Sequence, residues 1–228
     1  MFRSICSNAN LGGAVPDKKE TLTQKYKKLL ATSNQLEAEL SKAKRTLEIK
    51  DIELKAVLAQ AHEIKNTDAL TFLPNRRKII VELQEEVIRA SRYETPLSIS
   101  IVDIDHFKKV NDTYGHVVGD DVLRTIAARL REQIRHPDTI GRYGGEEFLI
   151  VLPNSDLKAA SEQAARLCRR IRALQVTSND HILSITISIG IAQYRNSREN
   201  WEQFLHRADK VLYQAKDNGR DQWAVAEE

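Results

Sequence analysis

Cysteine is scarce in this sequence, and long apolar runs are missing. The 228 residues contain two cysteines, Cys6 and Cys168, too few for a disulfide scaffold and without the spacing of a metal site. Such usage is typical of a reducing compartment. The longest wholly apolar run, Phe148 to Leu152, is far shorter than the roughly 18 residues of a membrane span. Residues 1–16 lack the basic and apolar regions of a signal peptide. We therefore expect a soluble, cytoplasmic protein with no membrane partner.

An excess of one charge sign is also missing. The 35 Lys and Arg residues nearly balance the 32 Asp and Glu residues, leaving a formal charge of +3. So small a charge does not indicate a nucleic-acid partner, and we expect none. The hydrophobic content of 41% suffices for a packed core. The length suits one domain of ordinary size plus an appendage.

The N-terminal part has its own composition. Residues 1–19 are expected to be disordered, whereas residues 20–66 contain no Gly, Pro, Phe or Trp and are rich in Lys, Glu, Leu and Ala. In this stretch, apolar residues or Tyr fill eleven of thirteen heptad seam positions, which are Leu22, Tyr26, Leu29, Ser33, Leu36, Leu40, Ala43, Leu47, Lys50, Leu54, Val57, Ala61 and Ile64. The pattern predicts a coiled coil that forms a parallel homodimer, with Ser33 and Lys50 weakening the seam. A lone surface helix is the alternative, but at ~1.5 Å per residue it would span roughly 70 Å.

The remaining residues alternate helix and strand patterns. Helical spacing of apolar residues predicts four helices, at Arg77–Arg92, Asp120–Ile134, Leu157–Leu174 and Trp201–Lys216. Strand patterns predict five strands, at Leu97–Asp103, Thr139–Tyr143, Glu146–Leu152, Ile182–Tyr194 and Gln222–Val225. Gly144 and Gly145 read as a two-residue hairpin turn between two of these strands. The expected fold class is α/β, with a mainly antiparallel sheet covered by helices.

Acidic residues cluster at the ends of predicted strands. Asp103 and Asp105 come where the strand 97–103 ends, and a spacing of two places both carboxylates on one side of an extended chain. Glu146 and Glu147 follow the glycine pair at the hairpin tip. Taken singly, either cluster is more often a solvated turn. Together they suit a hard cation with oxygen ligands, Mg²⁺ above all, that bridges to phosphates.

Several motifs in one order give the chain a family resemblance. They are DALTFLPNRR (Asp68–Arg77), DIDHFKKVND (Asp103–Asp112), TYGHVVGD (Thr113–Asp120), RYGGEEF (Arg142–Phe148) and DKVLYQAKDNGR (Asp209–Arg220). The segment from Asp68 to the C-terminus resembles the GGDEF family of diguanylate cyclases, with the signature loop in its GGEEF form. The resemblance implies a catalytic domain over residues 67–228 and a fold similar to adenylyl cyclase and polymerase palm domains. It also implies condensation of two GTP into cyclic di-GMP and two pyrophosphates across a dimer.

The resemblance assigns catalytic and metal-binding roles residue by residue. Asp103, the backbone carbonyl of Ile104, and Glu146 match the family's metal ligands. Two Mg²⁺ ions per active site, or Mn²⁺ in their place, would polarise the α-phosphate and activate the attacking 3′-hydroxyl. Glu146 also matches the proton acceptor, and the sequence leaves open how it combines the two roles. Glu147 would support the metal site, and Lys108 would stabilise charge in the transition state.

Other positions match substrate contacts of the family. Asn111 and Asp120 match a guanine-binding pair, and a carboxylate that accepts from guanine N1–H and N2–H₂ would leave adenine mispaired, at a cost of ~1–3 kcal/mol. For Asp120 the alternative is a helix N-cap after Gly119, and both roles could hold together. A lone His is more often structural, and for His116 a structural role is the alternative to a substrate contact. The backbone of Gly144 and Gly145 would lie close to the ribose and the α-phosphate. Lys216 and Arg220 would contact phosphates. For the last two, compensation of a helix dipole is the alternative.

A second site is implied upstream of the hairpin. Arg135 and Asp138 have the spacing to Gly144 of the family's RxxD inhibitory motif, and Arg166 matches a further contact. Cyclic di-GMP would bind there as a product inhibitor.

One residue departs from the family pattern. Phe72 stands where Gly is usual, and a positive φ there is costly for Phe. This puts the turn after the coiled coil in question, but not the catalytic residues. The rival interpretations are an inactive relative that is a GTP or cyclic di-GMP receptor, and a coiled-coil scaffold. Turnover of GTP with Mg²⁺ separates them.

Overall fold

The computed structural model describes residues 22–196 and 198–227, with the side chains of residue 56 and of residues 58–64 left out. The segment expected to be disordered, residues 1–19, and Cys6 lie outside this range. The chain consists of two compact units, and the boundary along the sequence lies between Ala59 and Gln60. Among the described residues, no helix has both the length and the apolar character needed to cross a membrane.

The predicted N-terminal helix is present as α1, Leu22–Asn66. Apolar side chains in the described part of this helix are exposed: Leu29, Leu40 and Leu47 expose 71%, 55% and 70% of their surface. Exposed apolar residues at heptad spacing are what a coiled coil buries against a partner helix. The helix is therefore consistent with the predicted coiled coil.

The second unit is built on a five-stranded sheet in the order β2-β3-β1-β6-β7. These strands are β1 (Leu97–Ile104), β2 (Thr139–Arg142), β3 (Glu147–Pro153), β6 (Ile187–Gln193) and β7 (Trp223–Val225). The central strand β1 pairs antiparallel with both β3 and β6, and only β7 runs parallel to its neighbour. The predicted class, a mainly antiparallel sheet with helices, is confirmed.

Helices cover both faces of this sheet. They are α2 (Arg76–Tyr93), α3 (Phe107–Tyr114), α4 (His116–Glu132), α5 (Leu157–Arg172) and α6 (Trp201–Asp217). Val102 and Ile104 of β1 join a core with α3, α4 and α5, while Ile99 and Ile101 join a second core with α2 and α6. Alternate β1 side chains thus enter different cores, as the period of two requires. The odd-numbered residues of β1, including Asp103, face α6.

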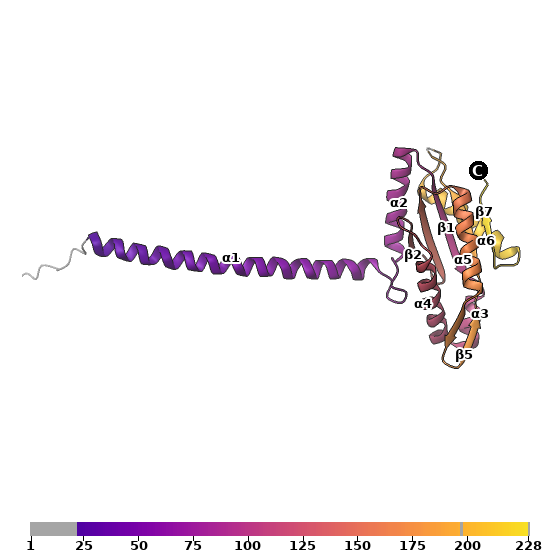
Figure 1. Cartoon of the computed structure of the whole chain (residues 1–228), viewed down its shortest axis with the longest axis horizontal. Helices are drawn as coiled ribbons and strands as arrows, with labels where there is room; N and C mark the ends of the chain where they lie inside the picture. The colour runs from indigo at the N-terminus through magenta and orange to yellow at the C-terminus, as the bar shows by residue number, and fades with distance from the viewer. Residues whose placement is uncertain (1–21, 197, 228) are drawn as a thin grey trace, which may run out of the picture. The chain divides into compact units, whose positions relative to one another are not determined.

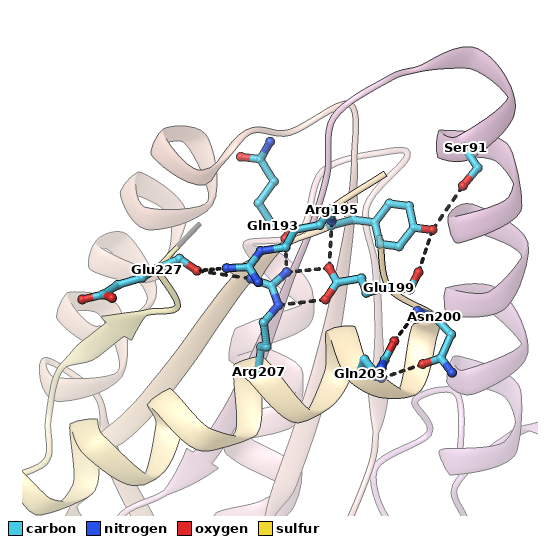
Figure 2. A network of polar contacts seen from close by, with 9 residues as sticks. Ser91, Gln193, Arg195, Glu199, Asn200, Gln203, Arg207 and Glu227 are labelled. Carbon is cyan, nitrogen blue, oxygen red and sulfur yellow. Dashed lines mark hydrogen bonds and ion pairs between the residues drawn. The ribbon is translucent and has the colours of Figure 1, made fainter. Parts of the chain in front are cut away.

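A partly buried ion pair between Glu199 and Arg207 holds α6 against the sheet (Figure 2). The Glu199 carboxylate, 6% exposed, accepts hydrogen bonds from Arg207 Nε at 2.8 Å and from the Arg195 backbone N–H at 2.7 Å. A second Arg207 nitrogen also donates to the carbonyl of Gln193 at the end of β6. Charge-assisted bonds of this kind are among the stronger polar contacts in proteins. They hold the first half of α6 on β6, so that its last turn has a fixed position.

Three predicted elements differ from the structure. The predicted strand Ile182–Tyr194 is two strands, because the chain leaves β5 (His181–Ser184), which pairs with β4 (Gln175–Ser178), before it enters β6. Figure 1 shows α4 and β5 at the same end of this unit. The helix predicted from Asp120 begins at His116, and α3 precedes it. The prediction of a two-residue hairpin turn is wrong, since four residues, 143–146, separate β2 from β3.

The turn between α1 and α2 is held by its own side chains. The Asp68 carboxylate accepts from the Thr71 backbone N–H at 2.9 Å and from its hydroxyl at 2.7 Å. Asn75 then caps α2 by accepting from the Lys78 N–H at 3.1 Å. Phe72, inside this turn, has φ 56°, the left-handed value that was suspected from the family pattern. Its ring is 70% exposed and adds little packing in compensation.

Replacing Phe72 by Gly should therefore stabilise the protein. Removing the Cβ relieves the left-handed strain, and the expected gain in unfolding free energy is about 0.5–1 kcal/mol. Phe72→Ala keeps the Cβ and the strain, so it is the matched control and should stay within about 0.5 kcal/mol of the parent. Urea denaturation measures both. Equal stabilisation by Ala and Gly would show that the benefit comes from removing an exposed ring rather than from backbone relief.

Candidate functional site

The predicted acidic residues come together where β1 ends and β3 begins. Asp103 is the register partner of Glu147, and the Ile104 N–H donates to the Glu146 carbonyl at 3.3 Å. Lys216, from the last turn of α6, places its ammonium 2.8 Å from Asp103 Oδ2. Antiparallel pairing of two strands far apart in sequence thus forms one cluster of carboxylates with a lysine beside it.

The carboxylates of this cluster repel one another in a partly buried setting. Desolvation raises the pKa of Asp103 above its ordinary value, and Lys216 opposes the rise. Desolvation also raises the pKa values of Glu146 and Glu147, and the negative charge of Asp103 raises them further. A cation would relieve both effects, because it offsets the repulsion and favours the ionised forms.

The oxygen ligands present fit a divalent metal ion. Among the described residues, no group of three or more His, Cys, Asp or Glu side chains forms a metal site by itself. The expected ligand set contains only two carboxylates, Asp103 and Glu146, and completes itself with the backbone carbonyl of Ile104. Hard cations of the Mg²⁺ kind accept such mixed oxygen donors and retain water or phosphate in the other positions. The clustered, mutually repelling carboxylates are the structural observation that supports this fit.

Asp105 acts on this cluster only through its charge, which raises the pKa of Asp103. Its buried carboxylate accepts hydrogen bonds from the hydroxyls of Thr186 and Ser188, both at 2.7 Å, and from the Asp221 backbone N–H at 3.0 Å. The spacing of two residues suggested that Asp103 and Asp105 bind a common cation. In the structure the two carboxylates instead have separate roles. Asp105 ties the end of β1 to β6 and to the segment after α6.

The hairpin loop is held from the turn after α1. Arg142 donates to the Gly145 carbonyl from Nε at 3.2 Å and from a terminal nitrogen at 2.6 Å. Its other terminal nitrogen donates to Asp68 at 3.1 Å. Burial raises the pKa of Asp68, but hydrogen bonds from Thr71 and Arg142 outweigh it and lower the pKa overall. The sequence analysis missed the bond between Arg142 and Asp68. The available signal was that both residues lie inside recognised motifs.

The two loop glycines differ in their surroundings. A Cβ at Gly145 would have no atom within 4 Å, so the backbone there is open to approach. A Cβ at Gly144 would lie 2.2 Å from Glu147 Oε2, so the lack of a side chain leaves room for that carboxylate.

The proposed guanine pair lies on α3 and α4. A Cβ at position 119 would lie 1.9 Å from the Asn111 amide oxygen. The Asn111 side chain therefore fits next to Asp120 only because residue 119 is glycine. The N-cap interpretation of Asp120 is wrong, since α4 begins at His116 with Gly115 as its N-cap. Lys108 and His116 are exposed, and within the described chain no interaction joins either to the acidic cluster.

The three residues of the predicted inhibitory site line one cavity of about 190 Å³, together with Ser155 and Gln163. Arg135 donates to Asp138 at 3.3 Å and to the Ser155 hydroxyl at 2.9 Å. Gln163 also donates to Asp138, at 3.2 Å. Desolvation raises the pKa of Asp138, and Arg135 opposes the rise. Arg166, which lies on α5, is exposed at the rim.

Comparisons with known proteins agree on one family. The family model described as "Diguanylate cyclase, GGDEF domain" matches residues 65–222. Diguanylate cyclase DgcP of Pseudomonas aeruginosa is 44% identical over 160 residues, which are 70% of this chain and 24% of that protein. This chain spans between 24% and 45% of the length of the curated relatives DgcP, PleD of Caulobacter vibrioides and diguanylate cyclase A of Treponema denticola.

Solved structures give the same answer. The coiled coil and GGDEF domain of DgcB from Caulobacter crescentus, in complex with c-di-GMP, superposes with a TM-score of 0.76 at 29% identity, covering 84% of this chain and 99% of that one. The active GGEEF domain of a diguanylate cyclase from Vibrio cholerae superposes with a TM-score of 0.64 at 33% identity, covering 68% and 99%.

The anchoring role of Asp105 predicts a large loss of stability in Asp105→Ala. Two hydroxyls and a backbone N–H lose a charged acceptor in a buried place, so the unfolding free energy should fall by about 2–4 kcal/mol. Asp112→Ala, an exposed acid on α3, is the control and should change it by less than about 0.5 kcal/mol. Chemical denaturation measures the difference. Similar costs for the two variants would refute the anchoring role.

Proposed function

This chain belongs to the GGDEF family of diguanylate cyclases, and we propose that it condenses two GTP molecules into cyclic di-GMP and two pyrophosphates. The observation that carries the proposal is the intact acidic cluster of Asp103, Glu146 and Glu147 beside Lys216 and Arg220. The alternative of an inactive relative is disfavoured because Asp103, Glu146 and Glu147 are all retained. GTP as substrate and the buried free thiol of Cys168 are consistent with the cytoplasm as the proposed location.

In the proposed reaction, the 3′-oxygen of one GTP attacks the α-phosphorus of the other. The new P–O bond forms as the bond to pyrophosphate breaks, and the 3′-proton leaves to a carboxylate, for which we propose Glu146. Glu146 is proposed for this role because it matches the family's proton acceptor and its carboxylate interacts with that of Asp103 in the acidic cluster. Two Mg²⁺ ions, held by Asp103, the Ile104 carbonyl and Glu146, would supply charge neutralisation at the phosphates. Glu147 would support this site from the adjacent strand.

The other chain groups bind and orient the substrate. Asn111 and Asp120 would accept and donate hydrogen bonds at the guanine edge, which selects GTP over ATP. Lys216, which pairs with Asp103, and Arg220, which donates to the Lys216 carbonyl, would contact phosphates, and Lys108 would join them when substrate is bound. The ion pair between Lys216 and Asp103 would then exchange for contacts with metal and phosphate. His116, at the start of α4, completes the proposed substrate contacts.

The product requires two active sites that face each other. One domain holds one GTP, whereas cyclic di-GMP contains two phosphodiester bonds. We propose that α1 of each chain pairs in a coiled coil and so raises the effective concentration of one domain around the other. The exposed apolar seam of α1 supports this assembly.

The cavity of Arg135, Asp138 and Arg166 is the proposed site for the product as inhibitor. It lies on the opposite side of β1 from α6, because Gln163 and Arg166 come from α5. Product bound there could join two domains without occupying the GTP site.

Glu146→Gln tests the catalytic proposal. The change is nearly isosteric and removes a metal ligand and the proton acceptor together, so conversion of GTP should fall by more than about a hundredfold. Stability should move by less than about 0.5 kcal/mol. Glu85→Gln, an exposed acid on α2, is the control and should be fully active. Chromatography of cyclic di-GMP formed with Mg²⁺ gives the rates, and a Glu146→Gln rate above a tenth of the parent rate would reject the assignment.

Charges in the α1 seam test the dimer. Leu47→Glu with Leu54→Glu places carboxylates at heptad a positions, so the protein should be monomeric and about tenfold less active when dilute. Ile49→Glu with Ile52→Glu changes equally exposed residues outside the seam and should leave dimer and activity in place. Light scattering and turnover at several enzyme concentrations measure both. A monomeric seam variant with full activity at low concentration would argue against the dimer.

Arg135→Ala tests product inhibition. Loss of a charged contact to the product should weaken inhibition by about tenfold or more, while turnover without added product is retained. Arg131→Ala, an exposed arginine on α4, is the control. Initial rates against added cyclic di-GMP at several GTP concentrations should show non-competitive inhibition in the parent. Inhibition that disappears at high GTP, or that is unchanged in Arg135→Ala, would place the product elsewhere.

A further inference from the structure

The segment that follows α6 holds three consecutive residues at positive φ. The values are 110° at Gly219, 65° at Arg220 and 50° at Asp221. The end of α6 explains the first of them. The Gly219 N–H donates to the Lys216 carbonyl and the Arg220 N–H donates to the Ala215 carbonyl at 3.0 Å, which is the bond pair of a Schellman helix end. Arg220 and Asp221 carry a Cβ, so their left-handed conformation must be held from outside the helix.

Asp221 is held at its backbone and at its carboxylate. Its N–H donates to Asp105 Oδ2 at 3.0 Å. Arg172, the last residue of α5, donates from Nε to the Asp221 carboxylate at 2.5 Å and from a terminal nitrogen to the Asp221 carbonyl at 3.1 Å. The planar guanidinium thus bonds one residue at two points, which fixes the backbone orientation as well as the side chain.

Arg220 depends on this fixed neighbour. One of its terminal nitrogens donates to the Lys216 carbonyl at 3.3 Å, and the ammonium of that lysine lies 2.8 Å from Asp103, on the side of the acidic cluster. A change of φ at Asp221 or at Arg220 itself would swing the guanidinium away from this side. An arginine that must be reordered on binding contributes less affinity than one already in place.

We propose that Arg172 is a positioning residue for the nucleotide. By holding Asp221 in the left-handed conformation, it aims Arg220 at the phosphates of GTP. The inference rests on the proposed function, in which Arg220 contacts those phosphates. Arg172 itself does not touch substrate. Its ion pair is partly solvated, with the two side chains 53% and 29% exposed, so the pair contributes little to global stability.

The test compares variants of the full chain. Arg172→Ala should raise the KM for GTP roughly threefold to tenfold, with kcat within about twofold, because binding geometry rather than chemistry is disturbed. Guanosine, which carries no phosphate, should keep its inhibition constant as a competitive inhibitor. Arg170→Ala, an exposed arginine on the same helix, is the matched control and should match the parent. Equilibrium binding of GTP and guanosine gives the same comparison without turnover.

Conservative and paired variants separate positioning from a general structural effect. Asp221→Asn keeps an oxygen for Arg172 and tolerates a left-handed backbone, so its KM should match the parent. Asp221→Ala should resemble Arg172→Ala, and the double variant should be no worse than either single one, since both remove the same link.

The Arg220→Ala variant distinguishes failure of the positioning role from failure of the phosphate assignment. If Arg220→Ala raises the KM for GTP while Arg172→Ala leaves it within twofold, the positioning role is overturned and the proposed function stands. If Arg220→Ala leaves GTP affinity unchanged, the phosphate assignment fails, and the positioning role fails with it. Equal weakening of GTP and guanosine in Arg172→Ala would also overturn the inference.

Discussion

The antiparallel pairing of β1 with β3 and β6 is the constraint on which the site depends. Both faces of β1 are buried, and alternate side chains enter two different cores. A slip of one residue would exchange those faces, so the register is strongly specified. That register makes Asp103 the neighbour of Glu147 on one side and of Ser188 on the other. The acidic cluster and the Asp105 anchor are therefore consequences of how the core is packed.

The cluster carries an electrostatic cost that serves no structural purpose. Desolvation raises the pKa values of Asp103, Glu146 and Glu147, and the charge of Asp103 raises those of the two glutamates further. Because the folded state holds these protons more tightly than the unfolded chain, the stability linked to them is present at acid pH and is lost as the pH rises through the raised pKa values. Lys216 offsets part of this cost at Asp103. Sites that sacrifice stability in this way are commonly functional.

Two of the places where non-glycine residues have a left-handed backbone flank the site. Phe72 lies in the turn whose Asp68 bonds Arg142, and Arg142 in turn holds the Gly145 carbonyl of the hairpin loop. Arg220 and Asp221 lie in the segment held by Asp105 and Arg172. Side chains of the turn itself hold the first conformation, whereas Asp105 and Arg172, from distant parts of the chain, hold the second.

The sequence by itself determined the fold class, the family and the chemical character of the site, because those depend on periodicity and on motifs that stay together in the chain. Helices α2, α5 and α6 follow from apolar spacing, and the residues proposed for metal and nucleotide follow from the recognised motifs. Only the tertiary structure decided what two acids two residues apart would do. Asp103 joins Lys216 and Glu147, while Asp105 accepts bonds from β6 and from the segment after α6. It also decided that the run from Ile182 to Tyr194 divides between two sheets, and that Arg142 and Arg172 act on the loops they reach. Such roles depend on partners dozens of residues away, and spacing along one strand or helix contains no information about them.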